Sequence, residues 1–266
     1  MKEDQARLFE HASPGVGLVV ATFAAVPYVH LHLEARRRLY PALTLLVHDD
    51  CSQKARELKL LCDHYGADFM SLPKRMNPCV GDMSSYIHGL RWAERLGLEL
   101  LVKMSRRFVP ISNWVPAFQR LAWESSAPTY SNECLHHKYG FRTECIGFHV
   151  TTWLRSPALE RLEAQVEANK EAFVEGLVHN LAREIHRAPQ CAHYLQYVKD
   201  NPRPVQSDAY AVWRLMPSRR TEKSDLLLWH DCDGAIDYAR LARLWRLPYG
   251  TADFADPNQG HGRRPA

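Results

Sequence analysis

A buried strand with a polar end is predicted by the stretch Leu98-Glu-Leu-Leu-Val-Lys-Met-Ser-Arg-Arg-Phe-Val-Pro110. Its apolar core, Leu100 to Val102, is typical of a strand that is covered on both faces of a parallel sheet. The run then ends in Lys103, Arg106 and Arg107, three cations within five residues. Open α/β sheets bind their ligands at the carboxyl ends of the strands, so this position predicts an anionic ligand.

The residues before this strand alternate between apolar runs and helical patterns. The expected strands cover 16–23, 43–47 and 67–72, and the expected helices cover 27–38, 53–65 and 83–96. We expect Ser52 to cap the second helix, Gly66 to end it, and Gly97 to end the third. This β-α-β-α-β-α-β order predicts an α/β fold with a mostly parallel sheet flanked by helices.

The pattern after Pro110 is less regular. Helices are expected over 114–123, within 157–186 and over 237–247, and strands over 129–131, 144–150 and 226–229. A helical C-terminal portion is therefore predicted. The last residues, 256–266, are rich in Gly, Pro and Arg and are expected to be disordered.

Composition narrows the classes of function. A length of 266 residues suits one large domain, and a net charge of +4 argues against a nucleic-acid binder with a basic stripe. The seven scattered cysteines include no CxxC pair, which favours reduced thiols. The charged N-terminus lacks the apolar core of a signal peptide, and the apolar run near 16–29 is too interrupted to span a bilayer. We therefore expect a cytoplasmic protein.

Three ordered stretches carry a resemblance to a known family. They are Val19-Val-Ala-Thr-Phe23 followed by Pro27, Leu45-Leu-Val-His-Asp-Asp-Cys-Ser52, and Asn77 to Gly81 with His88-Gly-Leu-Arg-Trp-Ala93. Together they resemble the nucleotide-sugar-dependent glycosyltransferases of the GT-A fold, in particular the family-2-like group. The resemblance covers residues 16–107.

The resemblance implies a single GT-A-like (Rossmann-like) domain over residues 1–255, with a nucleotide-binding half at about 14–110 and an acceptor half at about 111–255. It implies transfer of a sugar from a nucleoside diphosphate sugar to a glycan or lipid-linked acceptor, in surface polysaccharide or glycoconjugate synthesis of the bacterial type. A lipid-linked acceptor would bring the protein into peripheral contact with the inner face of the membrane. The implied nucleotide-sugar-binding residues are Thr22, Phe23, Asp49, Asp50, Asp82, Lys103, Ser105 and Arg107.

The Asp49-Asp50 pair has two interpretations. A carboxylate at the end of the second strand can accept hydrogen bonds from a ribose or a base edge. Alternatively, the pair forms a turn and a cap before the helix that follows Ser52. The second interpretation accounts for one carboxylate and leaves the other without a role, so we favour binding.

The chain departs from the family at the end of the fourth strand. Where these enzymes carry a metal-binding Asp-x-Asp, this sequence has Ser105-Arg106-Arg107, and neither serine nor arginine suits a hard divalent cation. Lys103-Met-Ser-Arg-Arg-Phe108 is similar instead to the Lys-x-Ser-x-Arg-aromatic segment of metal-independent relatives. We therefore expect no metal cofactor, with Arg107, helped by Lys103, binding the diphosphate. The alternative is a solvated basic strand end.

The general base that an inverting transfer requires has the weakest signal in the sequence. The resemblance implies an acidic residue that opens a later helix, for which Glu175 is the nearest counterpart. Glu144 and His149 are competitors on the strand expected at 144–150. A solvated helix glutamate is the alternative interpretation of Glu175.

Two other functions remain open. An Asp-x-Asp does occur at Asp231 and Asp233, beside His230, which allows a metal-dependent phosphoryl-transfer or hydrolytic enzyme that also uses Asp49. A turn before a helix explains the same residues without a metal. The second possibility is a non-catalytic descendant that binds a nucleotide sugar or a protein. The sequence does not set the oligomeric state.

Overall fold

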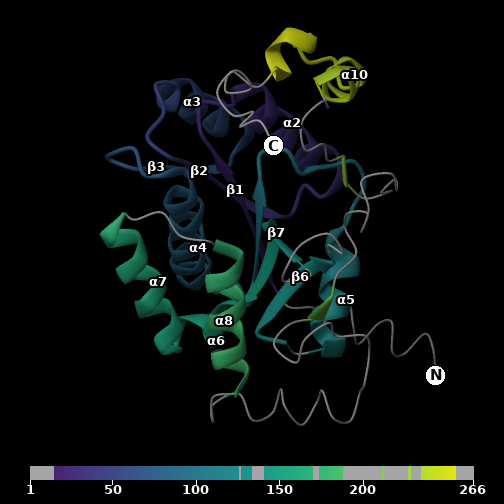
Figure 1. The fold of residues 1–266 in the computed structure, drawn as a ribbon. Coiled ribbons are helices and arrows are strands. Elements are labelled where there is room, and N and C mark those ends of the chain that lie inside the picture. The colour runs from purple at the N-terminus through teal and green to yellow at the C-terminus, as the bar shows by residue number, and fades with distance from the viewer. Residues whose placement is uncertain are drawn as a thin grey trace, which may run out of the picture.

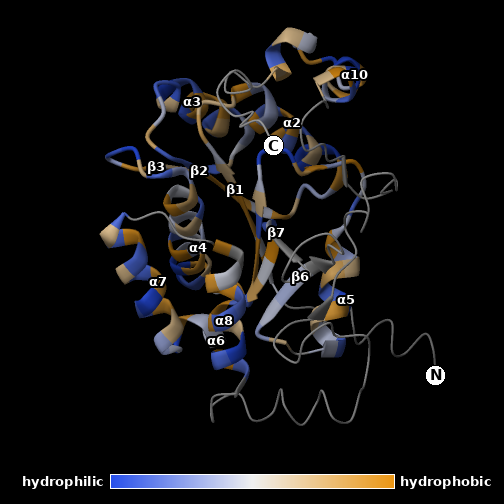
Figure 2. Cartoon of the chain, viewed as in Figure 1, coloured by the Kyte–Doolittle hydropathy of each residue, from blue (hydrophilic) through white to orange (hydrophobic). Residues whose placement is uncertain are grey.

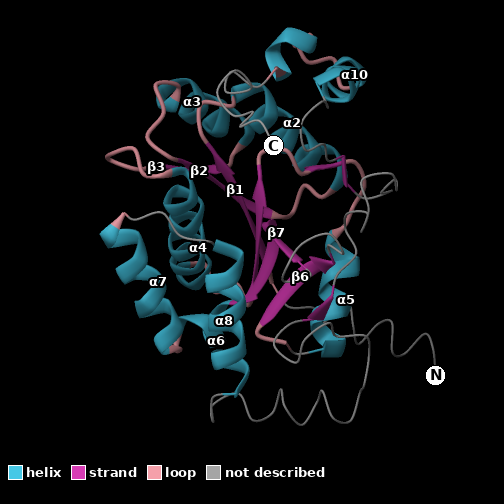
Figure 3. Ribbon diagram, viewed as in Figure 1, coloured by secondary structure: helices cyan, strands magenta, loops and turns pink. Residues whose placement is uncertain are grey.

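The protein is described here by a computed structural model, which covers residues 15–125, 127–133, 141–169, 174–187, 211–212, 227–228 and 235–255. The predicted disorder of 256–266 lies outside these residues. Within them, a seven-stranded sheet runs through the centre of the molecule (Figure 3). Its spatial order is β3 (Asp68–Ser71), β2 (Thr44–Asp49), β1 (Val16–Thr22), β4 (Leu100–Ser105), β7 (Phe141–His149), β6 (Thr129–Glu133) and β8 (Ala211–Val212).

The directions of these strands confirm the predicted sheet type. The neighbours β3, β2, β1 and β4 pair in parallel. Only β7 is reversed among the seven described strands of this sheet, because it pairs antiparallel with both β4 and β6, and β8 pairs parallel with β6. A second, two-stranded sheet joins β5 (Val109–Pro110) to β9 (Leu227–Leu228). The fold is α/β with a mostly parallel sheet, as expected.

Helices cover both faces of the main sheet (Figure 1). One face carries α2 (Val26–Leu39), α3 (Ala55–Tyr65), α5 (Val115–Ser125), α10 (Ala235–Leu244) and the 3₁₀ helix η2 (Thr251–Phe254). The other face carries α4 (Pro78–Arg95), α6 (Val150–Leu154), α7 (Pro157–Ala168) and α8 (Val174–Arg187). The predicted helical C-terminal portion thus contributes to both faces. None of the described helices is long and apolar enough to cross a membrane.

Each face of the sheet has its own hydrophobic core, because successive side chains of a strand point to opposite faces. In β4, Leu100 and Val102 join the core beneath α2, while Leu101 joins the core beneath α4. Figure 2 shows the apolar strands between amphipathic helices. The same alternation sends Lys103 toward α4, where its side chain is fully buried.

Two helix starts differ from the prediction. Helix α4 begins at Pro78, before the expected start at residue 83. The Asn77 side chain accepts a hydrogen bond from the Cys79 backbone N–H at 3.2 Å, and a proline suits the first helical turn. Helix α3 begins at Ala55 with Lys54 at its N-cap position, so the predicted cap by Ser52 is wrong. Ser52 Oγ instead accepts from the Lys54 N–H at 3.2 Å in the turn before the helix.

The predicted helix ends are confirmed. Gly66 (φ +62°) ends α3 and Gly97 (φ +68°) follows α4, both in the left-handed region that favours glycine. The elements α6, β5, β8 and η2 were not predicted, since runs of two to five residues leave no periodic pattern.

Candidate functional site

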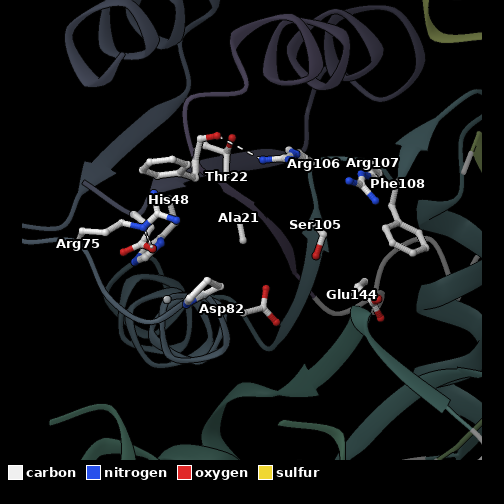
Figure 4. Close-up of a pocket in the computed structure, with 14 residues that line it drawn as sticks. Ala21, Thr22, His48, Arg75, Asp82, Ser105, Arg106, Arg107, Phe108 and Glu144 are labelled. Carbon is white, nitrogen blue, oxygen red and sulfur yellow. Dashed lines mark hydrogen bonds and ion pairs between the residues drawn. The ribbon is translucent and has the colours of Figure 1, made fainter. Parts of the chain in front are cut away.

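A cavity of about 310 Å³ opens at the carboxyl ends of the parallel strands (Figure 4). Ala21 of β1 is paired in register with His48 of β2 on one side and Ser105 of β4 on the other. The short Ala21 side chain leaves space between its two neighbours, and the first turn of α4 closes that space from the opposite side. The fold thus forms its cavity at the position where open α/β sheets bind ligands.

The cavity brings together seven of the residues predicted from the sequence: Thr22, Phe23, Asp50, Asp82, Ser105, Arg107 and Glu144. It also contains Arg106, one of the three cations at the end of β4, and residues that were not predicted from the sequence, among them His48, Arg75 and Gly81. Arg75 lies in the loop that follows β3, so the rule about strand ends, applied to that strand as well, would have indicated this loop.

Asp50 lies between the loop after β3 and the first turn of α4. Its Oδ1 accepts a hydrogen bond from the Met76 N–H at 3.1 Å, and its Oδ2 is 3.2 Å from Arg75 Nε. Burial raises the pKa of the Asp50 carboxyl, against the opposite effects of the Met76 N–H and the Arg75 charge. A Cβ on Gly81 would lie 2.6 Å from Asp50 Oδ2, so only glycine lets the helix approach so closely.

Asp49 is placed differently from its neighbour. It is fully buried, and its Oδ2 accepts from the Ser52 N–H at 2.8 Å and from the Ser71 hydroxyl at 3.0 Å. The turn-and-cap interpretation therefore describes Asp49, whereas Asp50 is the carboxylate at the cavity. A direct role for Asp49 in nucleoside binding stays a prediction.

The turn after β1 forms a second wall. The Arg75 guanidinium carbon lies 3.1 Å from the centroid of the Phe23 ring. Thr22 Oγ1 is buried and has no hydrogen-bond partner in the part of the chain that the structure describes. Two residues that are not glycine, Ala24 (φ +54°) and Cys51 (φ +53°), adopt left-handed backbone conformations just beyond the ends of β1 and β2. Such strained turns often accompany binding sites.

Lys103 lies beneath the cavity lining. Its ammonium forms an ion pair with Asp82 and donates to Ser105 Oγ at 3.1 Å and to the Thr143 carbonyl at 3.3 Å. The other oxygen of Asp82 accepts from the Tyr86 hydroxyl at 2.8 Å. These contacts hold the Asp82 carboxylate in one orientation at the cavity.

The two arginines of the β4 end come from one turn and point in different directions (Figure 4). Arg106 Nη1 donates to the Phe23 carbonyl at 3.3 Å, which joins the ends of β4 and β1. Arg107 lies on the side of the cavity that carries Glu144 of β7.

His48 belongs to a buried imidazole pair. Its Nε2 lies 2.9 Å from His88 Nδ1 on α4, so one ring must donate and the other accept. Burial, and then the His88 charge, lower the pKa of His48 to about 3. The pair is therefore neutral at pH 7.

The other candidate catalytic residues are only partly described. Glu175 lies in the first turn of α8, but its side chain is outside the described part of the structure, so its role as base stays a prediction. His230, Asp231 and Asp233 also lie outside the described residues. His149 ends β7, and its Nδ1 lies 3.0 Å from the Thr152 hydroxyl.

The residues at the end of β4 do not fit the divalent cation of the resembled family. Ser105, Arg106 and Arg107 supply no carboxylate, and the Asp82 carboxylate is already engaged by Lys103. Within the described ranges, no group of three or more His, Cys, Asp or Glu residues is arranged to hold a metal ion.

The chain shows only distant similarity to known proteins. No family model matches the sequence, and no curated protein does. Among solved structures, the chain is similar to the glycosyltransferase GlyE of Streptococcus pneumoniae TIGR4, at 10% identity and a TM-score of 0.44, over 63% of this chain and 43% of GlyE. It is also similar to S. aureus TarS 1–349 in complex with UDP (12% identity, TM-score 0.43, 70% of each chain) and with UDP-GlcNAc (11%, 0.44, 70% of this chain and 71% of TarS).

These likenesses do not define an activity. The chain spans less than half the length of GlyE. At such identities and scores, a function must be argued from the cavity itself.

Proposed function

We propose that the protein transfers a sugar from a nucleoside diphosphate sugar to a hydroxyl of a glycan or lipid-linked acceptor, without a divalent metal. A role in surface polysaccharide or glycoconjugate synthesis is part of this proposal. The observation that carries it is that one cavity at the strand ends is lined by three arginines and two carboxylates, namely Arg75, Arg106, Arg107, Asp50 and Glu144. Such a cavity has partners for both a diphosphate and hydroxyl or N–H groups.

The nucleoside would occupy the end near β2. Asp50, held by Met76 and Arg75, offers carboxylate oxygens to ribose hydroxyls or to an N–H of the base. The flat surfaces of Phe23 and Arg75 suit stacking on a base. The buried Thr22 hydroxyl, which has no hydrogen-bond partner among the described residues, would gain one from the ligand.

The diphosphate would lie across the β4 end. A guanidinium binds a phosphate through two parallel hydrogen bonds, so Arg107 can meet the charge that a metal meets in other enzymes. The N-terminus of α4 also faces the cavity at Pro78, and a helix N-terminus favours negative charge.

The sugar and the acceptor would then lie toward Asp82 and Glu144. Asp82, oriented by Lys103 and Tyr86, can accept from sugar hydroxyls. Glu144 would take the proton of the acceptor hydroxyl as that oxygen bonds to the anomeric carbon and the nucleoside diphosphate leaves. Glu175 is the alternative base.

A thermal-shift screen of UDP, GDP and CDP and their sugars, each with EDTA and with Mn²⁺, tests the proposal. A ligand that binds the folded state raises the melting temperature with its saturation. We expect a shift that survives EDTA and is reduced in Arg107→Ala. The matched control is Arg56→Ala, which removes the same charge from an exposed position outside the cavity and should keep the shift.

Other outcomes would favour the other functions. A shift that requires Mn²⁺ would contradict metal-free binding and direct attention to Asp231 and Asp233. Binding without turnover of any donor sugar would favour a non-catalytic nucleotide-sugar-binding protein. The absence of a shift with every nucleotide would contradict the proposal as a whole.

A further inference from the structure

The turn at the end of β4 is fixed through its backbone. The Arg106 N–H donates to the Ala21 carbonyl at 3.1 Å, and the Phe108 N–H donates to the Ser105 carbonyl at 3.0 Å. The backbone carbonyls of Arg106 and Arg107 lie beyond β4, which ends at Ser105, so the hydrogen bonds of the sheet do not reach them.

Side chains from two helices hold these two carbonyls. His32 of α2 is fully buried, and its Nε2 lies 3.1 Å from the Arg106 carbonyl oxygen. Burial lowers the pKa of His32 to about 4, so the ring is neutral and donates its Nε2–H. Tyr238 of α10 donates its hydroxyl to the Arg107 carbonyl at 2.5 Å, across 131 positions of the sequence.

Tyr238 is itself held rigidly. Its side chain is 1% exposed, and its ring is stacked on Phe254 at 5.8 Å and meets the edge of Tyr28 at 4.8 Å. The Tyr28 hydroxyl donates to the Phe254 carbonyl at 2.8 Å, which ties η2 to α2. Figure 1 shows α10 close to α2. A buried aromatic side chain that reaches one carbonyl is well suited to fix that peptide group.

We propose that Tyr238 is a positioning residue for the diphosphate end of the site, and that it acts through the backbone of Arg107. This inference rests on the proposed function. The carbonyl that Tyr238 binds belongs to the residue whose guanidinium would hold the diphosphate, so a displacement of this part of the turn moves the Arg107 side chain with it. A displacement of about 1 Å is enough to weaken a bidentate contact substantially. The segment 235–255 is thus part of the donor site although it is remote in sequence.

The test compares two ligands and two tyrosines. The affinities of the nucleoside diphosphate that binds best in the screen and of its monophosphate are measured by calorimetry on the full-length protein. The variants are Tyr238→Phe, Arg107→Ala and their combination. The matched control is Tyr249→Phe, which also removes a tyrosine hydroxyl from the segment 235–255. The Tyr249 hydroxyl lies 2.9 Å from Nδ1 of His30 on α2 and does not contact the turn after β4 through this bond.

We expect Tyr238→Phe to weaken the diphosphate about threefold to tenfold, as the loss of one buried hydrogen bond implies, and to leave the monophosphate unchanged. In the Arg107→Ala background the same substitution should have no further effect, because the two residues act on one contact. Tyr249→Phe should bind both ligands as the wild type does.

Several results would overturn the inference. If Tyr238→Phe bound the diphosphate normally while Arg107→Ala did not, the proposed function would stand and the positioning role would fall. Equal weakening of both ligands, or an effect that adds to that of Arg107→Ala, would reduce Tyr238 to a general structural role. If Arg107→Ala also bound the diphosphate normally, or if the wild type bound no diphosphate, both the proposed diphosphate site and the positioning role of Tyr238 would be contradicted.

Discussion

Replacing Lys103 with methionine removes the charge that lies beneath the cavity while keeping a long apolar stem. The Lys103 ammonium is fully buried and has three partners: Asp82, Ser105 Oγ and the Thr143 carbonyl. Methionine offers none of them a donor. The Asp82 carboxylate would then keep the hydrogen bond from the Tyr86 hydroxyl beside the cavity.

The expected loss of stability follows from the burial of the pair. Removing one partner of a buried ion pair costs about 3–5 kcal/mol, because the other charge remains unpaired. The Asp82 side chain is 25% exposed, so water reaches it and reduces the cost to about 2–3 kcal/mol. For a chain of this size, that loss lowers the melting temperature by about 4–10 °C.

Urea unfolding of Lys103→Met measures this value. The double variant Lys103→Met/Asp82→Asn should recover part of the loss, because it leaves no unpaired carboxylate. The control is Lys59→Met on α3, where an exposed lysine pairs with Asp63 at 2.7 Å and should contribute less than about 1 kcal/mol. A Lys103→Met protein as stable as the Lys59→Met control would refute the assignment of Lys103 as a buried support of Asp82.

Three further predictions concern the cavity wall. Gly81→Ala should displace the Asp50 carboxylate, lower the stability by about 1 kcal/mol and weaken nucleotide binding. The control Gly250→Ala, where a Cβ meets nothing closer than 3.9 Å, should bind nucleotide normally. Unchanged nucleotide affinity in Gly81→Ala would contradict this prediction. The depressed pKa of His48 means that its contribution to stability is complete above the unfolded pKa of 6.5 and is lost as the pH falls from there toward 3, by up to about 2.7 kcal/mol near pH 4.5. His48→Gln should therefore lose less stability on acidification than the wild type, which urea midpoints measured above pH 6.5 and at about pH 4.5 would show. An equal loss in both proteins would argue against a buried neutral ring. Glu144→Gln should lower kcat at least a hundredfold with the donor affinity retained, while Glu160→Gln, at an exposed position of α7, keeps full activity. Normal turnover in Glu144→Gln would move the role of base to Glu175.

The sheet was predictable because apolar runs separated by helical patterns leave a strong signal. Four such runs became the four parallel strands β1 to β4, and Gly66 and Gly97 marked helix ends correctly. The start of α4 was missed because its first turn contains Pro78 and Gly81, residues that also occur in loops. That error hid the approach of the helix to Asp50, which depends on the missing Cβ.

The residues of the site were predictable where a strand end alone places them. Thr22, Asp50, Ser105 and Arg107 met in one cavity for that reason. The orientation of Lys103 follows from strand alternation with the buried Leu101, although its partner Asp82 lies on a helix that sequence spacing does not align. Tyr238 was beyond prediction, because its contact with the Arg107 carbonyl requires the packing of α10 against α2.

Calorimetric titration of a nucleoside diphosphate in EDTA and in Mn²⁺ tests the central claim most directly, on the wild type and on Arg107→Ala. If guanidinium groups replace the metal, the wild type binds with the same Kd in both buffers, and Arg107→Ala weakens binding about tenfold or more, as expected for a lost charged contact. Binding that appears only with Mn²⁺, or that is indifferent to Arg107→Ala, would contradict the account.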